Sequence, residues 1–197
     1  MALSFWFEFA STYSYPTALT IERLARERGV EVSWRAFLLG PIFREQGWND
    51  SPFNLYPAKG RYMWRDLERV CEGLGLPLRR PSVFPRNGLG AARVACHFAQ
   101  EPWLPAFVRA VYSANFRDDL DIAEPSVLAD CLREAGADPD AALDAANTPE
   151  AKNALRTQCQ QAADLGLFGA PSFVVGNELF WGNDRLSQAL DFASRDA

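Results

Sequence analysis

The chain has 197 residues, of which 48% are hydrophobic and 23% charged, and its formal net charge is −5. This composition is typical of a globular protein, and the mild acidity argues against a nucleic-acid-binding surface, which needs clustered lysine and arginine. No apolar stretch is long enough to cross a bilayer, and the start, MALSFWFEFA, lacks the basic segment of a signal peptide. We therefore expect no membrane partner and a cytoplasmic location.

The four cysteines, Cys71, Cys96, Cys131 and Cys159, are widely separated and form neither a C-x-x-C pair nor a zinc-binding pattern. Each lies in a segment with helical periodicity, so we expect them to be small hydrophobic side chains of the core. The only histidine, His97, also lies on a helical pattern, and we expect it to have a structural role. The sequence therefore predicts no metal site and no catalytic thiol of its own.

The N-terminal part of the chain predicts a βαβ unit. Residues 3–9, LSFWFEF, place Leu3 and the phenylalanines on one face of a strand. Residues 16–29, PTALTIERLARERG, have apolar side chains at helical spacing and end at a glycine. Residues 30–37, VEVSWRAF, alternate again and predict a second strand, which we expect to be parallel to the first.

The middle of the chain predicts a block of helices. Residues 38–54 contain several glycines and prolines, which favour a loop. Helical patterns follow at residues 62–75, 88–101, 104–117, 125–136 and 138–165. Short connections with proline or glycine separate them, and the sequence has no internal repeat.

The end of the chain changes character and predicts a hairpin followed by a helix. Two short runs, Ser172–Val175 and Glu178–Trp181, flank a Gly-Asn turn. The last helix is expected to begin at Asn183 or Asp184. The fold class is therefore α/β: residues 1–40 and 165–197 form one domain, and residues 41–164 form a large all-helical insertion.

The segment FEFASTYSYP, residues 7–16, carries a cluster of hydroxyl side chains between the first strand and the first helix. A serine at such a junction usually caps the helix by accepting hydrogen bonds from its free backbone N–H groups. The alternative interpretation uses the same positive potential, which lowers the pKa of a thiol held there, while a hydroxyl donates to the resulting thiolate. At this level the residues leave both interpretations open.

Two further motifs lie near the C-terminus. In FGAPSFVV, residues 168–175, Pro171 is either an ordinary turn proline or a cis-proline that leaves the main chain of Ala170 free to pair with a peptide-like ligand. In WGNDRL, residues 181–186, Asn183 and Asp184 are typical of a helix start. They also suit a site in which backbone N–H groups bind a carboxylate and Asp184 binds an ammonium group.

Taken together, these motifs resemble the 2-hydroxychromene-2-carboxylate isomerases, relatives of the kappa-class glutathione transferases with a DsbA-like thioredoxin fold. Residues 11–14 form S-x-x-S where thioredoxin relatives carry C-x-x-C, although Thr12 stands where the family usually has proline. The G-x-P-S-F and W-G-N-D-R-L motifs then follow, so the resemblance spans essentially the whole chain. It implies a thioredoxin-like domain, glutathione as cofactor, a homodimer, and a small aromatic carboxylate as substrate.

The resemblance also implies roles for individual residues. Ser11 is the implied catalytic serine, which hydrogen-bonds the sulfur of glutathione. The residues implied to bind glutathione are Ser11, Asn54, Ala170, Pro171, Trp181, Gly182, Asn183 and Asp184. Arg44 and Asn54 are implied to contact the substrate.

The implied function is glutathione-dependent isomerisation of an aromatic enone carboxylate, of the type that converts 2-hydroxychromene-2-carboxylate to trans-o-hydroxybenzylidenepyruvate. The glutathione thiolate adds reversibly and allows rotation about the former double bond. Two alternatives remain open: a kappa-like glutathione S-transferase that conjugates electrophiles, and a non-catalytic thioredoxin-fold binding module. A dithiol oxidoreductase is disfavoured, because the redox cysteine pair is absent.

Overall fold

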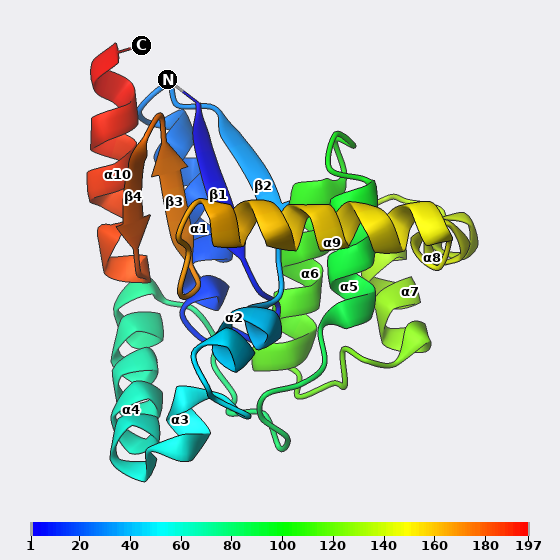
Figure 1. Ribbon diagram of the computed structural model, residues 1–197, viewed down its shortest axis with the longest axis horizontal. Helices are drawn as coiled ribbons and strands as arrows, with labels where there is room; N and C mark the ends of the chain where they lie inside the picture. Colours follow the sequence, from blue (N-terminus) through cyan, green and yellow to red (C-terminus); the bar gives the residue numbers. More distant parts are fainter. Residues whose placement is uncertain (1, 197) are drawn as a thin grey trace.

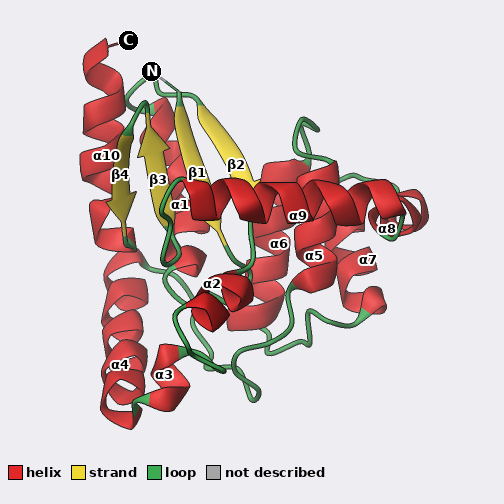
Figure 2. Cartoon of the chain, in the orientation of Figure 1, coloured by secondary structure: helices red, strands yellow, loops and turns green. Residues whose placement is uncertain are grey.

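The computed structural model describes residues 2–196 and contains a four-stranded sheet with strand order β2-β1-β3-β4 (Figures 1 and 2). Strands β1 (Leu3–Phe7) and β2 (Val32–Ala36) are parallel and are joined by helix α1 (Ser14–Arg26). Strand β3 (Ser172–Val175) pairs antiparallel with β1, and β4 (Glu178–Trp181) pairs antiparallel with β3. The predicted βαβ unit and C-terminal hairpin are confirmed.

The alternation in β1 directs its side chains into two different clusters. Leu3, Phe5 and Phe7 are fully buried in the main core, which includes residues of α1 and of the last helix, α10 (Leu186–Ala193). Trp6 belongs to a smaller cluster on the opposite face, with residues of α2 and of helix α9. Figure 1 shows α9 crossing in front of the sheet, while α1 lies behind it. The sheet is therefore covered on both faces, as a mixed sheet with buried central strands requires.

The remaining helices form the block between β2 and β3. They are α2 (Leu39–Glu45), α3 (Pro52–Leu55), α4 (Pro57–Leu74), α5 (Leu89–His97), α6 (Leu104–Phe116), α7 (Pro125–Glu134), α8 (Pro139–Ala146) and α9 (Pro149–Asp164). Several of them begin with a proline, whose fixed φ and missing N–H suit the first helical position. Among residues 2–196, no helix combines the length and the apolar character needed to cross a membrane. The division into a domain and an insertion stays a prediction.

Part of the predicted loop at residues 38–54 is helical in the structure. Helix α2 follows β2 almost directly and contains Pro41 in its first turn, where proline is tolerated. The side chain of Ile42, on α2, is buried. The short helix α3 begins at Pro52, and the hydroxyl of Ser51 accepts a hydrogen bond from the Phe53 amide at 3.3 Å. Two of the prolines that suggested a loop, Pro41 and Pro52, therefore lie in the first turns of helices.

The long helical pattern at residues 138–165 is divided into α8 and α9. The break lies at Asn147 and Thr148, and Pro149 opens the second helix. The Thr148 hydroxyl accepts a hydrogen bond from the Ala151 amide at 3.3 Å, which caps α9.

Helix α6 holds the exit of β1 in place. The Tyr112 hydroxyl donates to the carbonyl of Glu8 at 2.8 Å, and the Asn115 side-chain amide donates to the carbonyl of Phe9 at 3.2 Å. The amide of Ser11 turns back to the same Glu8 carbonyl at 2.9 Å. Buried backbone groups are therefore paired where the strand ends, and the segment that leads to α1 has a defined course.

Replacement of Tyr112 by phenylalanine tests this anchor. The variant removes one of two hydrogen bonds to the Glu8 carbonyl, so we expect the free energy of unfolding to fall by about 1 kcal/mol. Urea denaturation measures it. Tyr62→Phe is the control, since the Tyr62 side chain is exposed. Equal stability of Tyr112→Phe and the wild type would contradict the proposed anchor.

Candidate functional site

A cavity of about 1520 Å³ opens where β1 runs into α1. Its walls are the β1–α1 junction, α2, α4, the loop before α5, and the segments on either side of the β3–β4 hairpin. The sequence-predicted residues that line it are Ser11, Arg44, Ala170, Trp181, Gly182, Asn183 and Asp184. The fold thus brings together residues from both ends of the chain and from α2.

The Ser11 hydroxyl lies at the centre of a short hydrogen-bond chain. It donates to the carbonyl of Ala170 at 2.8 Å and accepts from the hydroxyl of Ser14 at 3.0 Å. Its contact with the Ser14 amide is longer, 3.4 Å, and α1 begins at Ser14. Ser11 therefore does more than cap the helix, because the shorter of its contacts are those to Ser14 Oγ and Ala170.

The peptide bond between Ala170 and Pro171 is cis, as one interpretation of the motif predicted. Pro171 itself is not part of the cavity wall, whereas Ala170 is. The Ala170 carbonyl is bonded to Ser11, and its amide makes no hydrogen bond within the described part of the chain. The Ala170 amide is therefore a free main-chain donor at the cavity.

Two glycines allow the Trp181 segment to approach Ala170. A Cβ at Gly169 would lie 2.4 Å from the Nε1 atom of Trp181, so only glycine lets the indole rest there. The Trp181 ring also meets Phe168 edge-on, with 4.9 Å between ring centroids. Gly182 has φ of +108°, and a Cβ there would lie 2.5 Å from a carboxylate oxygen of Asp184.

Asn183 and Asp184 differ in how firmly they are held. The Oδ1 atom of Asn183 accepts a hydrogen bond from the Thr17 hydroxyl at 2.9 Å, which ties it to α1. Asp184 is 73% exposed, and its carboxylate lies 3.6 Å from the guanidinium of Arg185. Helical geometry begins at Asn183, in one 3₁₀ turn before α10, as predicted. Asp184 is therefore an accessible carboxylate beside the cavity.

Arg44 and Asn54 are placed differently. Arg44 lies on α2 at the cavity rim and is exposed. Asn54 does not line the cavity: its side-chain amide donates to the carboxylate of Asp50 at 3.1 Å and to the carbonyl of Phe84 at 3.3 Å. The structure therefore brings Arg44, but not Asn54, to the site, and the roles of both stay predictions.

None of the cysteines lines the cavity, and all of their thiols are partly or fully buried. Burial raises the pKa of Cys71 and of Cys96 to about 11. It also raises the pKa of Cys131, to about 12, and that of Cys159. These thiols stay protonated near neutral pH, so the site contains no thiolate from the chain itself.

Among the cavity residues that were not predicted from the sequence, Tyr13 and Glu8 carry ionisable groups with shifted pKa values. The Tyr13 hydroxyl donates to the carboxylate of Asp66 on α4 at 2.7 Å, and burial together with this bond raises the pKa of Tyr13. Glu8 also lines the cavity, and burial of its carboxyl raises its pKa from 4.5 to about 7. The hydrogen bond from the Ala10 amide, 3.1 Å long, opposes that rise. The position of Glu8 directly after β1, three residues before Ser11, was the available signal.

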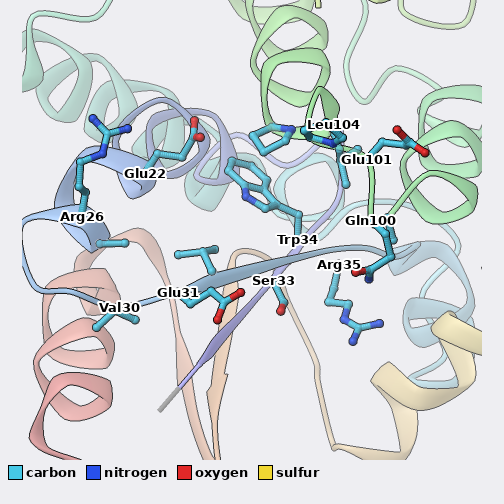
Figure 3. A pocket seen from close by; sticks show the side chains of 15 residues that line it. Glu22, Arg26, Val30, Glu31, Ser33, Trp34, Arg35, Gln100, Glu101 and Leu104 are labelled. Carbon is cyan, nitrogen blue, oxygen red and sulfur yellow. The ribbon is translucent and has the colours of Figure 1, made fainter. Parts of the chain in front are cut away.

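A second cavity of about 440 Å³ lies at the free edge of β2. Figure 3 shows Glu22 and Arg26 of α1 on one side, Gln100 and Glu101 on the other, and Trp34 between them. It contains none of the residues predicted for a site. The larger cavity is therefore the candidate functional site.

Residues 2–192 match the family described as DSBA-like thioredoxin domain. This chain belongs to that family. It is 31% identical over 185 residues to the 2-hydroxychromene-2-carboxylate isomerase of Sphingobium xenophagum, with 93% of each chain covered. It is 26% identical over 198 residues to glutathione S-transferase kappa 1 of Homo sapiens, covering 92% of this chain and 85% of that one.

A solved structure of a 2-hydroxychromene-2-carboxylate isomerase superposes on the present chain with a TM-score of 0.89 and 25% sequence identity. The match covers 99% of this chain and 95% of the other. The thioredoxin-like fold and the relation to these isomerases and to kappa-class transferases, both predicted from the motifs, are confirmed.

The ionisation of Glu8 predicts a pH dependence of stability. Its folded-state pKa, about 7, lies above the ordinary value of 4.5, so the wild type loses stability as pH rises through this window. Glu8→Gln removes the ionisation, and we expect its melting temperature relative to wild type to rise between pH 5 and pH 8. Calorimetry at several pH values measures this, with Glu101→Gln as the control at an exposed carboxyl of the second cavity. A pH-independent difference between Glu8→Gln and the wild type would contradict the prediction.

Proposed function

We propose that this chain is a glutathione-dependent isomerase of aromatic enone carboxylates, of the type that converts 2-hydroxychromene-2-carboxylate to trans-o-hydroxybenzylidenepyruvate. The observation that carries the proposal is the Ser11 hydroxyl bonded to the main chain of Ala170, at a cavity that none of the cysteines lines. A nucleophilic sulfur at this site therefore has to come from a bound molecule. The relatives named as isomerases and kappa-class transferases support the same conclusion.

The cavity residues fit the tripeptide glutathione. The free amide of Ala170 suits main-chain pairing with the cysteinyl part, with Pro171 fixing the turn behind it. The exposed carboxylate of Asp184 suits the ammonium of the γ-glutamyl part, and Asn183 lies beside it. Trp181 and Gly182, which directly precede Asn183, also line the cavity.

Bound glutathione supplies a thiolate that adds to the conjugated double bond and leaves again after rotation about the resulting single bond. A free thiol has a pKa of about 8.5 and is only a few per cent ionised at pH 7, so the protein has to stabilise the anion. The Ser11 hydroxyl does so by turning from the Ala170 carbonyl to donate to the sulfur. The Ser14 hydroxyl, 3.0 Å from Ser11 Oγ, keeps that oxygen oriented, and the start of α1 contributes positive potential.

The acceptor side of the cavity suits a flat aromatic acid. Phe43 and Trp48 lie together on the wall, with 5.7 Å between ring centroids, and Phe53 lines the cavity as well. The exposed guanidinium of Arg44 can bind a carboxylate in fork geometry. Asn54 can reach the substrate only if its amide leaves Asp50 and the Phe84 carbonyl.

A kappa-like transferase is the second candidate, since one relative carries that name. The same thiolate would then attack an electrophile and stay attached to it. Assays with a benzylidenepyruvate and with chlorodinitrobenzene separate isomerisation from conjugation. A non-catalytic binding module would show neither activity, and failure of millimolar glutathione to raise the melting temperature would favour it.

Substitution of Ser11 by alanine tests the role of the hydroxyl. A hydrogen bond to a charged group contributes about 1.5–3 kcal/mol, so we expect the pKa of bound glutathione to rise by roughly one to two units. The ultraviolet absorbance of the thiolate, titrated against pH, measures it. Ser187→Ala on α10, where the hydroxyl only accepts a bond from Arg28, is the control. An unchanged pKa in Ser11→Ala would remove Ser11 from the mechanism.

Substitution of Asp184 by alanine tests the site for the ammonium group. We expect glutathione affinity to fall by about tenfold, the effect of losing one charge-assisted hydrogen bond, while the fold stays intact. Isothermal titration calorimetry measures the affinity. Asp130→Ala is the matched control, because Asp130 is also exposed and paired with a nearby arginine, but lies outside the cavity. Equal affinities of the two variants would exclude Asp184 from the site.

A further inference from the structure

We propose that Glu8 is the catalytic acid of this site and, when protonated, donates to the carbonyl oxygen of the bound enone. The inference rests on the proposed function and adds a second group to it. Ser11 acts on the sulfur, whereas Glu8 acts on the oxygen at the far end of the conjugated system.

The first support is the position of Glu8 relative to Ser11. The Ser11 amide donates to the Glu8 carbonyl at 2.9 Å, so one tight turn joins the two residues, and both side chains line the same cavity. The Glu8 Oε1 atom faces the loop before α5, since a Cβ at Gly88 would lie 3.5 Å from it. Ala170 lies two residues before β3, the strand that neighbours β1 in the sheet. Ser11 Oγ thus contacts Ala170, whereas Glu8 Oε1 faces the loop at Gly88.

The second support is that the carboxyl has a free oxygen. Among residues 2–196, the Glu8 side chain makes one hydrogen bond, from the Ala10 amide to Oε2. The fold needs no further contact from this carboxyl, and Oε1 stays available to a ligand. Gly88 allows the close approach of the loop, because a Cβ there would lie 2.8 Å from the Cβ of Phe9.

The third support is that no cation among residues 2–196 forms an ion pair with the Glu8 carboxyl, which would favour its ionised form. The Arg86 guanidinium, on the adjoining loop, pairs with Asp119 and with the Oδ1 atom of Asn115. The nearby Tyr112 of α6 already donates its hydroxyl proton to the Glu8 main chain, and Asn87 accepts from the Leu89 amide. Because no cation offsets it, burial raises the pKa of Glu8 to about 7. Both protonation states of the carboxyl are therefore populated near neutral pH.

Such an acid completes the electron flow of the proposed reaction. As the carbon–sulfur bond forms, the π electron pair of the double bond moves through the conjugated system to the carbonyl oxygen. Glu8 transfers its proton to that oxygen and becomes a carboxylate. When the carbon–sulfur bond breaks, the carbonyl re-forms and the proton returns to Glu8, so nothing is oxidised or reduced and no co-reactant is needed.

The first test is a binding measurement that needs no turnover. The probe is 4-(2-hydroxyphenyl)-2-oxobutanoate, which keeps the ketone and carboxylate but lacks the double bond. Calorimetry at pH 6 and pH 8 should show wild-type affinity falling by about tenfold as Glu8 loses its proton, whereas Glu8→Gln shows no such fall. Glu101→Gln, in the second cavity, should follow the wild type.

If Glu8→Gln keeps the wild-type pH dependence, or if the wild type does not bind the probe, the assignment of Glu8 is wrong. Activity gives a second readout: Glu8→Gln should lower kcat by about 100-fold and lose the decline of kcat above pH 7. Glutathione affinity and the pKa of the bound thiol should stay as in the wild type. A raised pKa of the bound thiol would show that Glu8 acts on the sulfur, and would overturn its role as acid to the enone. An unchanged kcat would overturn that role as well.

The two proposals fail in different ways. Failure of wild-type protein to bind glutathione overturns the proposed function, whatever the probe does. Loss of the pH effect in the probe experiment, with normal glutathione binding and isomerisation, overturns only the role of Glu8.

Discussion

The candidate site depends on one hydrogen bond, from the Ser11 hydroxyl to the Ala170 carbonyl, which joins residues 159 positions apart. It forms because β1 pairs antiparallel with β3, with Trp6 opposite Ser172, so the exit of one strand and the entry to the other meet at the same end of the sheet. The Ser11 hydroxyl, three residues before α1, thereby lies against the main chain that a peptide-like ligand could use. Displacement of either strand would separate the two halves of the proposed glutathione site.

Much of this arrangement was predictable from short motifs. The S-x-x-S segment, G-x-P and W-G-N-D resemble the motifs of a known family, and that resemblance implied Ser11, Ala170 and the segment that begins at Trp181 before the fold was known. The alternation of β1 also predicted which side chains enter the main core. Sequence reasoning works here because contacts within a few residues, or a strict period, decide the outcome.

The parts that were missed depend either on contacts between distant segments or on local hydrogen bonds that the residue pattern does not reveal. Glu8 directly follows β1 and looks like an ordinary polar residue until the loop at Gly88 approaches it. Asn54 belongs to a recognisable segment, yet its amide is engaged by Asp50, which lies four residues earlier and competes with any ligand. The break between α8 and α9 rests on the cap at Thr148, a signal hidden inside a continuous helical pattern.

A crystal structure of the chain with bound glutathione tests the central claim most directly, because it locates the sulfur. We expect the sulfur within hydrogen-bonding distance of Ser11 Oγ, the cysteinyl main chain paired with the Ala170 amide, and the γ-glutamyl end beside Asp184. A sulfur remote from Ser11, or glutathione seated in the cavity beside Trp34 instead, would contradict it.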